Sequence, residues 1–386
     1  MRFLHVADLH IGKTVNGFSM IEDQKHILGE IIRLSVESKA QALIVAGDFY
    51  DKSMPSAEAV ALVDRFLTNA VNAGLKVIAV SGNHDSSERI AYASDLLKSQ
   101  GVIVSPVFNG QISSYAMEDE HGVVRFWLIP YIKPVHVRPY YPEKEIASDY
   151  TSAMECVIDS CSFDESERHV LVCHQFVTSG SKKPELSDSE ISLGGLDNVD
   201  SSVFEPFSYV ALGHIHRAQR IGRDAIRYSG SPLKYSYSEI NHVKSATLVE
   251  IDEEGAVKFE LLPLTPLRDL RDIKGPLDAL VSEAVVAEGN PEDYLKIVLS
   301  DEHPAIDALS LLRDAYPNVM GIEYENSSTK SQIQAERPTE VLENIDPLEL
   351  FARFYREQNG TGLTEGQTQL VSWAFIQASE HQGGAQ

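Results

Sequence analysis

The sequence has few cysteines and no long hydrophobic run, and each shortage excludes a class of protein. Its three cysteines, Cys156, Cys161 and Cys173, are an odd number that gives no disulfide framework. No stretch approaches the roughly eighteen uninterrupted apolar residues of a membrane-spanning helix, so we expect no membrane association. The first residues have the pattern of a strand and not of a signal peptide, so we expect a cytoplasmic protein.

Basic residues are also scarce: 33 lysines and arginines stand against 57 aspartates and glutamates, a net charge of −24. This balance argues against a simple DNA-binding module, because phosphate contacts normally come from a basic face. It does not exclude a nuclease, since bound metal ions would supply local positive charge. Six basic residues lie in or between the motifs described below and could contact a phosphate backbone, although any one of them is more often an ordinary surface charge. They are Lys13, Arg89, Lys133, Lys182, Lys183 and Arg217.

Five short apolar runs each end in a block of aspartate, asparagine or histidine. Runs of this length and composition predict buried strands. They are Arg2–Ala7, Ala42–Ala46, Lys76–Ser81, His169–Cys173 and Tyr209–Leu212. In open α/β sheets the chemistry gathers in loops just past the carboxyl ends of strands, so we expect the polar blocks to share one site. A single block is common by chance, whereas five in one chain favour a site for two metal ions.

The residue types suit phosphoester chemistry. Two cations about 3.5–4 Å apart need a bridging anion, and a carboxylate such as Asp48 can contact both. Imidazole and carboxylate ligands suit manganese, iron or zinc. A water bound by two such cations becomes a hydroxide near neutral pH, which is a nucleophile able to attack phosphorus.

The polar blocks, taken in order, resemble the motif set of the calcineurin-like metallophosphoesterases. The matching residues are Asp8-x-His10, Gly47-Asp48-x-x-Asp51, Gly82-Asn83-His84-Asp85, His174 and Gly213-His214-x-His216. Three further segments, Met1–Thr14, Tyr228–Leu233 and Pro347–Phe351, are similar to the SbcD nuclease subunits of bacterial SbcCD complexes. The resemblance covers nearly the whole chain and implies an α/β fold, a layered sandwich of two mixed β-sheets flanked by helices.

The resemblance also assigns a role to most motif residues. The residues expected to hold one metal ion are Asp8, His10 and His216. Those expected to hold the second are Asn83, His174 and His214, with Asp48 bridging the two ions. His84 would bind no metal and would protonate the leaving oxygen, and its neighbour Asp85 is a candidate to orient the ring and favour its protonated form. Asp51 has no assigned role, and the expected cofactors are two divalent ions, with Mn²⁺ preferred.

The chain divides into four predicted parts. Residues 1–265 predict the phosphoesterase domain, in which Ser19 and Glu22 have capping-box spacing before a helix to about Ser38, and Ser56–Ala73 predicts a helix that Gly74 ends. Residues 266–326, with a helix around Pro276–Glu288, predict a small α+β module, by resemblance a capping domain. Residues 327–340 predict a polar linker, and residues 341–386 predict a C-terminal helical segment.

The C-terminal segment carries apolar faces at helical spacing in Pro347–Gln358 and Thr364–Ser379. The resemblance implies that these faces, built on Phe351, Phe354, Trp373 and Phe375, dock an SbcC-type ATPase. The alternative is that they pack on their own domain. The resemblance also implies DNA as a partner and allows a homodimer within a heterotetramer.

Together these observations predict a metal-dependent DNA phosphodiesterase. By resemblance it would be a double-strand 3'-5' exonuclease and a single-strand or hairpin endonuclease that works with an ATPase in DNA repair, recombination and replication. A small-molecule phosphodiesterase or phosphatase is the first alternative, since a fold does not fix a substrate. A non-catalytic scaffold is the second, but it requires missing ligands and none is missing here.

Overall fold

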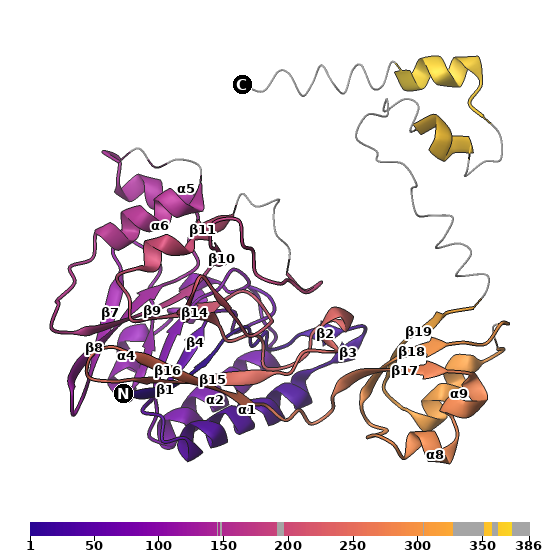
Figure 1. Ribbon diagram of the computed structural model, residues 1–386, viewed down its shortest axis with the longest axis horizontal. Coiled ribbons are helices and arrows are strands. Elements are labelled where there is room, and N and C mark those ends of the chain that lie inside the picture. Colours follow the sequence, from indigo (N-terminus) through magenta and orange to yellow (C-terminus); the bar gives the residue numbers. More distant parts are fainter. Residues whose placement is uncertain are drawn as a thin grey trace. The chain divides into compact units, whose positions relative to one another are not determined.

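The computed structural model describes residues 1–144, 146, 149–190, 197–303, 305–326, 351–356 and 362–372. The chain divides into two compact units, Met1–Tyr324 and Glu325–Gln386. The first unit contains two six-stranded sheets with helices outside them (Figure 1). Within the described ranges, no helix is long and apolar enough to cross a membrane.

The first sheet is mixed, with a parallel half and an antiparallel half. Its strands, in spatial order, are β16 (Val257–Pro263), β15 (Ser245–Ile251), β1 (Arg2–Val6), β4 (Ala42–Ala46), β5 (Lys76–Val80) and β6 (Val102–Val104). Strands β1, β4, β5 and β6 are parallel, because helices α1 (Ile21–Glu37) and α2 (Ala57–Asn72) connect successive strands. Both helices bury one apolar face against this sheet.

The second six-stranded sheet is also mixed. Its strands, in order, are β13 (Gln219–Ile221), β14 (Arg223–Tyr228), β12 (Tyr209–Gly213), β9 (Arg168–His174), β8 (Gly122–Ile129) and β7 (Ser113–Asp119). Helix α6 (Tyr150–Asp159) packs its buried face with the outer side of β9 and β12. The central strands β8, β9, β12 and β14 run parallel to one another.

A continuous apolar layer lies between the two sheets. Phe3 of the first sheet meets Phe126 and Tyr209 of the second edge-on, with ring centroids 5.6 and 5.7 Å apart. Strand β4 is buried along its full length, because one face meets this layer and the other meets the helices. Uninterrupted apolar runs are therefore required in the central strands, and the predicted layered α/β fold is confirmed.

Shorter elements join these layers. Helices α3 (Ser87–Ile90) and α4 (Ser94–Gln100) lie between β5 and β6, and α5 (Pro134–Val137) follows β8. The others are β2 (Thr14–Val15), β3 (Phe18–Ser19), β10 (Phe176–Thr178), β11 (Asn198–Asp200), η1 (Arg138–Tyr140), η2 (Ser201–Phe204) and η3 (Tyr237–Glu239). The last of these, η3, contains Glu239, which lies beside His216.

The first unit ends in a small α+β module. Strands β17 (Leu270–Gly275), β18 (Tyr294–Leu299) and β19 (Val319–Tyr324) form a parallel sheet that packs on α7 (Leu277–Leu280) and α9 (Ala308–Ala315). The module contacts the first sheet and α1 through an apolar cluster that includes Leu270 and Tyr294. Arg268 and the Tyr294 hydroxyl also donate to the buried Asp23 carboxylate of α1, at 2.8 Å each to Oδ2.

Two local predictions are wrong. Ser19 forms no capping box, because it pairs with Thr14 in the β2–β3 hairpin and Met20 is the residue that precedes α1. The helix expected around Pro276–Glu288 is divided into α7 and α8 (Glu283–Val286). By contrast, the helix predicted at Ser56–Ala73 is present as α2, and the Ser56 hydroxyl caps it by accepting from Ala59 N.

The second unit is helical at residues 351–356 and 365–372. Phe354 and Leu370 are exposed there, by 57% and 64%. The linker predicted at 327–340, and the residues Trp373 and Phe375, lie outside the described residues.

Gly29 in α1 offers a test of the helix. It is exposed, and a Cβ built on it would meet nothing within 4 Å. Glycine in a helix interior is less favourable than alanine by about 1 kcal/mol, so Gly29→Ala should raise the free energy of unfolding by roughly 0.5–1 kcal/mol. Urea unfolding of the two proteins measures this difference, and a lower midpoint for the variant would contradict the exposed position of Gly29.

Candidate metal centre

The five predicted polar blocks meet at one place. The first sheet supplies the residues that follow β1, β4 and β5, and the second supplies those at the ends of β9 and β12. The arrangement brings together Asp8, His10, Asp48, Asn83, His84, His174, His214 and His216. The expectation of a single shared site therefore agrees with the positions of these side chains.

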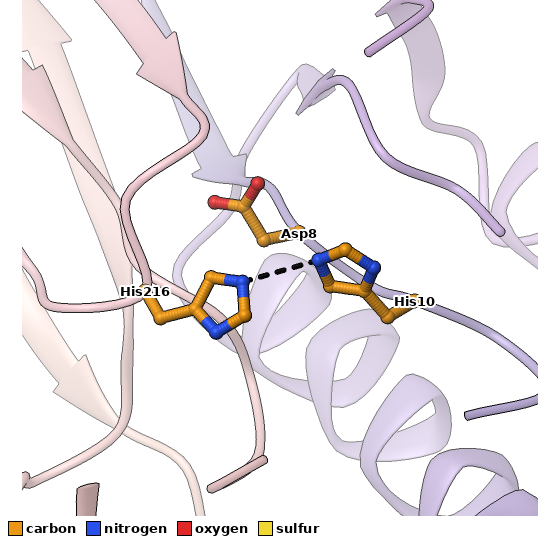
Figure 2. A group of neighbouring side chains, drawn as sticks. All are labelled: Asp8, His10 and His216. Carbon is orange, nitrogen blue, oxygen red and sulfur yellow. Dashed lines mark hydrogen bonds between the residues drawn. The ribbon is translucent and has the colours of Figure 1, made fainter. Parts of the chain in front are cut away.

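Asp8, His10 and His216 form one candidate ligand group. One ligand atom of each lies within 4.8 Å of the others. Figure 2 shows the two imidazole rings facing each other, with His10 Nε2 and His216 Nε2 3.1 Å apart and the Asp8 carboxylate beside them. Two ring nitrogens at this distance repel unless a proton or a cation lies between them.

Asn83, His174 and His214 form the second group. Asn83 Oδ1 is 2.9 Å from both His174 Nε2 and His214 Nδ1. Asp48 lies between the two groups, since its Oδ2 is 3.3 Å from His174 Nε2 and 3.6 Å from His10 Nε2. This is the position that a bridging carboxylate needs.

Two hydrogen bonds join the sheets at this point. His174 Nδ1 donates to Ala46 O over 2.8 Å, and His214 N donates to Asp8 Oδ1 over 2.9 Å. The first bond fixes the ring so that Nε2 faces Asn83 and Asp48. The imidazole is thereby oriented as a metal ligand.

Several of these residues have unusual backbone conformations. Asp8, His10, Asp48 and His214 all have positive φ, at 54°, 45°, 53° and 109°. Such conformations cost of order 1–3 kcal/mol each in non-glycine residues and cluster at functional sites. The four residues are held in these turns because the surrounding sheets fix both ends of each loop.

The motif glycines are required by close packing around the ligands. A Cβ on Gly82 would lie 2.1 Å from Asp48 Oδ1, and a Cβ on Gly213 would lie 1.9 Å from Ala46 O. Neither position leaves space for a side chain. The glycines therefore allow the loops of the two sheets to approach each other.

The electrostatics fit a site for cations. Burial raises the pKa of Asp8 to about 7, and Asp8 Oδ2 has no hydrogen-bond partner among the residues that the structure describes. Burial alone would lower the pKa of His174, but the Asp48 carboxylate outweighs it and raises the pKa to about 9. Burial, followed by the charge of His174, lowers the pKa of His214 to about 3. The raised pKa of His174 means that its ring carries a proton beside Asp48 at neutral pH, and binding of a metal ion there would release that proton.

His84 lies beside the first group, and one of its ring nitrogens is close enough to His10 and Asp48 for these three to form a further candidate ligand group. Its Nδ1 lies 3.0 Å from the main-chain oxygen of Asp51, and its ring meets the His10 ring edge-on at 4.8 Å between centroids. Its main-chain N–H donates to Asp48 Oδ1. Asp51, which had no assigned role, therefore positions the His84 ring through its backbone.

Asp85 does not orient His84, contrary to the expectation from their adjacency. Its carboxylate accepts hydrogen bonds from the main-chain N–H groups of Phe49, Tyr50 and Gly82, at 3.0–3.1 Å. It therefore ties the loop after β4 to the loop after β5, and acts on the site through the position of the loops.

Gln24 of α1 also holds the site and was not predicted from the sequence. Its Nε2 donates to His10 O at 2.7 Å, and its Oε1 accepts from Gly12 N at 2.9 Å. Gln24 is buried in the same face of the helix as Ile27, Leu28 and Ile31. A polar residue on the otherwise apolar face of a helix is the sequence feature that could have identified Gln24.

The six basic candidates are not equivalent. Lys13 lies at the site and pairs with Asp51 at 2.8 Å. Arg217 pairs with Glu185, and Arg89 donates to Ser53 O. Lys133 lies 5.9 Å from the centre of the Tyr131 ring. Lys182 and Lys183 are exposed.

Comparison with known proteins identifies the family. A model of the calcineurin-like phosphoesterase family matches residues 1–218, more than half of the chain. The chain belongs to this family. A second model, of the type 5 capsule protein repressor C-terminal domain, matches residues 266–359 of the phosphoesterase.

A relative of similar length is also known. The phosphoesterase is 29% identical over 379 residues to the SbcD subunit of the nuclease SbcCD from Staphylococcus epidermidis, and the match covers 96% of this chain and 97% of the relative. The predicted resemblance to SbcD subunits is therefore confirmed.

Two solved structures are more distantly similar. A dimetal phosphatase from Danio rerio aligns with 69% of this chain and 98% of its own, with 14% identity and a TM-score of 0.37. A protein from Thermus thermophilus aligns with 67% of this chain and 98% of its own, with 10% identity and a TM-score of 0.36.

The close packing at Gly82 gives a test of the centre. Gly82→Ala would force a methyl group against Asp48, so we expect impaired uptake of divalent ions and a loss of stability of about 1–3 kcal/mol, typical of overpacking. Calorimetric titration with Mn²⁺ and thermal unfolding measure the two effects. Gly29→Ala is the matched control and should bind as the unchanged protein does. Full Mn²⁺ uptake by the Gly82 variant would contradict the proposed geometry.

Proposed function

We propose that this phosphoesterase is a two-metal-dependent DNA nuclease, a double-strand 3'-5' exonuclease and a single-strand or hairpin endonuclease. We further propose that it is cytoplasmic and acts with an SbcC-type ATPase in DNA repair, recombination and replication. The observation that carries the proposal is the convergence of two ligand groups, a carboxylate between them and His84 at one rim. The 29% identity to a nuclease subunit across nearly all of both chains supports DNA as the substrate.

The ligand groups assign each metal ion its residues. Asp8, His10 and His216 would hold the first divalent ion. Asn83, His174 and His214 would hold the second, with Asp48 contacting both. When bound, the ions would supply positive charge to the phosphoryl group and acidify a water molecule for attack on phosphorus. Mn²⁺ is the ion we expect, since it accepts both carboxylate and imidazole ligands.

His84 is proposed as the general acid. Because its Nδ1–H is directed to Asp51 O, a second proton would be carried on Nε2. That proton can pass to the oxygen that leaves phosphorus. Asp48 accepts a hydrogen bond from the main-chain N–H of His84. This bond fixes the position of the proposed acid relative to the proposed bridging carboxylate.

The remaining parts of the chain have proposed roles in substrate access and assembly. The α+β module, proposed as a capping domain over 266–326, would shape the approach of DNA. The segment 341–386 would dock the ATPase, and the exposure of Phe354 and Leu370 in its described helical residues supports this role. A homodimer within a heterotetramer is the assembly that we propose.

Removal of metal is the direct test of the chemistry. Treatment with EDTA should abolish hydrolysis of double-stranded DNA, and Mn²⁺ should restore it, because the site residues only assemble a nucleophile around cations. A generic aryl phosphodiester should be assayed in parallel. Cleavage of that ester without cleavage of DNA would favour a small-molecule phosphodiesterase, whereas full DNA cleavage by demonstrably metal-free protein would refute the metal requirement.

Two variants separate metal binding from proton transfer. His84→Ala should keep both ions and lose roughly 10²–10⁴-fold in exonuclease rate, the usual contribution of a general acid. Asp48→Ala should lose metal, because the anion between the cations is removed. Elemental analysis and single-turnover kinetics measure the two effects. His121→Ala, in the β7–β8 turn, is the control and should change neither quantity, whereas equal metal loss in the first two variants would contradict the role of His84.

Deletion of residues 341–386 tests the docking segment. Metal content and folding should be retained, because every proposed ligand precedes residue 217. Binding to an SbcC-type ATPase in a pull-down should be lost, together with ATP-stimulated cleavage of double-stranded DNA, since the apolar faces would be the contact surface. A truncated protein that unfolds or aggregates would mean that these helices complete the core of the phosphoesterase itself.

A further inference from the structure

A buried carboxylate lies behind the ligand His216, outside every motif identified in the sequence. Glu239, the last residue of η3, is fully buried, and its Oε1 lies 3.3 Å from His216 Nδ1. This is the ring nitrogen that points away from His10, because His216 Nε2 is the atom 3.1 Å from His10 Nε2. Glu239 therefore contacts the face of His216 opposite to the proposed metal ion.

The charge of Glu239 is balanced by Lys244, which is also buried. Lys244 Nζ lies 2.5 Å from Glu239 Oε2 and donates to Ser231 Oγ at 2.8 Å. The Ser189 hydroxyl donates to Glu239 Oε1 at 2.9 Å. A buried carboxylate is costly unless it is paired and hydrogen-bonded, and both conditions are met here.

The same network holds the backbone of His216. Lys244 Nζ donates to His216 O at 2.8 Å, and His216 N donates to Glu190 Oε1. The ring, the main-chain oxygen and the main-chain nitrogen of His216 are thus each fixed by a charged side chain.

The two ligand groups differ in this respect. The Nδ1–H of His174 is directed to a neutral main-chain oxygen, that of Ala46, whereas Nδ1 of His216 faces a carboxylate. A carboxylate partner makes an imidazole a stronger donor to a metal than a carbonyl partner does. The group Asp8, His10 and His216 therefore has an additional source of affinity.

We propose that Glu239 is a positioning residue for the metal centre, which holds His216 with Nε2 directed at the first ion, and that Lys244 makes this buried carboxylate possible. The inference rests on the proposed role of His216 as a metal ligand. Glu239 itself touches neither substrate nor metal. Its effect should therefore appear in the affinity for one ion.

The test is Mn²⁺ binding by the full chain, measured by calorimetry in competition with a chelator. Glu239→Gln keeps the size of the side chain and removes its charge. It should weaken one of two binding steps by roughly 10–100-fold, the usual effect of losing such a partner, and leave the other step unchanged. The unfolding temperature in excess chelator should stay within a few degrees of the unchanged protein, roughly the shift of a 1 kcal/mol effect.

A second variant keeps the proposal testable if Glu239→Gln does not fold. Glu239→Gln leaves the buried Lys244 ammonium without its counter-charge, so the double variant Glu239→Gln with Lys244→Met removes both charges together. It should show the same selective loss. Lys234→Met is the matched control, because Lys234 pairs with Asp269 at 2.9 Å in the same stretch of chain and should change neither binding step.

The outcomes are distinct. Wild-type affinity for both ions in the Glu239 variants would overturn the proposal, and so would an equal loss in both steps accompanied by a lower unfolding temperature in chelator. An unchanged protein that binds no Mn²⁺ would instead refute the proposed function, and the two failures are therefore distinguishable.

Discussion

The candidate metal centre depends on the contact between the two sheets, where His174 Nδ1 donates to Ala46 O at 2.8 Å and His214 N donates to Asp8 Oδ1 at 2.9 Å. Neither sheet carries a full ligand set. The first contributes carboxylates and an amide with one imidazole, and the second contributes imidazoles alone. The ligands can therefore converge only when the apolar layer around Phe3 and Tyr209 holds the sheets at their observed separation. A change in the packing of that layer would therefore also change the geometry of the candidate centre.

Much of the fold could be predicted because the central strands are buried on both faces. Their apolar runs have no polar interruption until the strand ends, so the first polar residue marks the rim of the sheet. This argument located β4 and β12 within a residue of their observed bounds. The capping-box prediction at Ser19 failed, because that pattern spans only four residues and the β2–β3 hairpin uses Ser19 for a strand pair. Here one local interaction, the pairing of Thr14 with Ser19, replaces another.

The convergence of the motif side chains could be predicted from the sequence, but the residues that hold them in place could not. Asp85 follows His84 directly, yet its side chain turns to the main chain of Phe49 and Tyr50, because the tight loop after β5 directs adjacent side chains to different partners. Glu239 lies in a polar, serine-rich stretch that by pattern resembles a surface loop. Its burial arises from contacts with residues distant in the sequence, including His216. No periodicity in a single sequence carries that information.

A chain with a net charge of −24 whose proposed substrate is a polyanion must offset its own field at the site. Its nearby basic residues do this only in part, since Lys13 is paired with Asp51 and Arg217 with Glu185. The buried carboxyl groups of Asp8 and Asp48 add acidic groups at the point where the phosphate would lie in the proposed mechanism. Two divalent cations would reverse that charge locally, so occupation of the metal centre and binding of the scissile phosphate are coupled in the proposed mechanism. Grip on the rest of a DNA substrate would then fall to a partner, which is why the C-terminal segment matters to the proposed function as much as the metal ligands do.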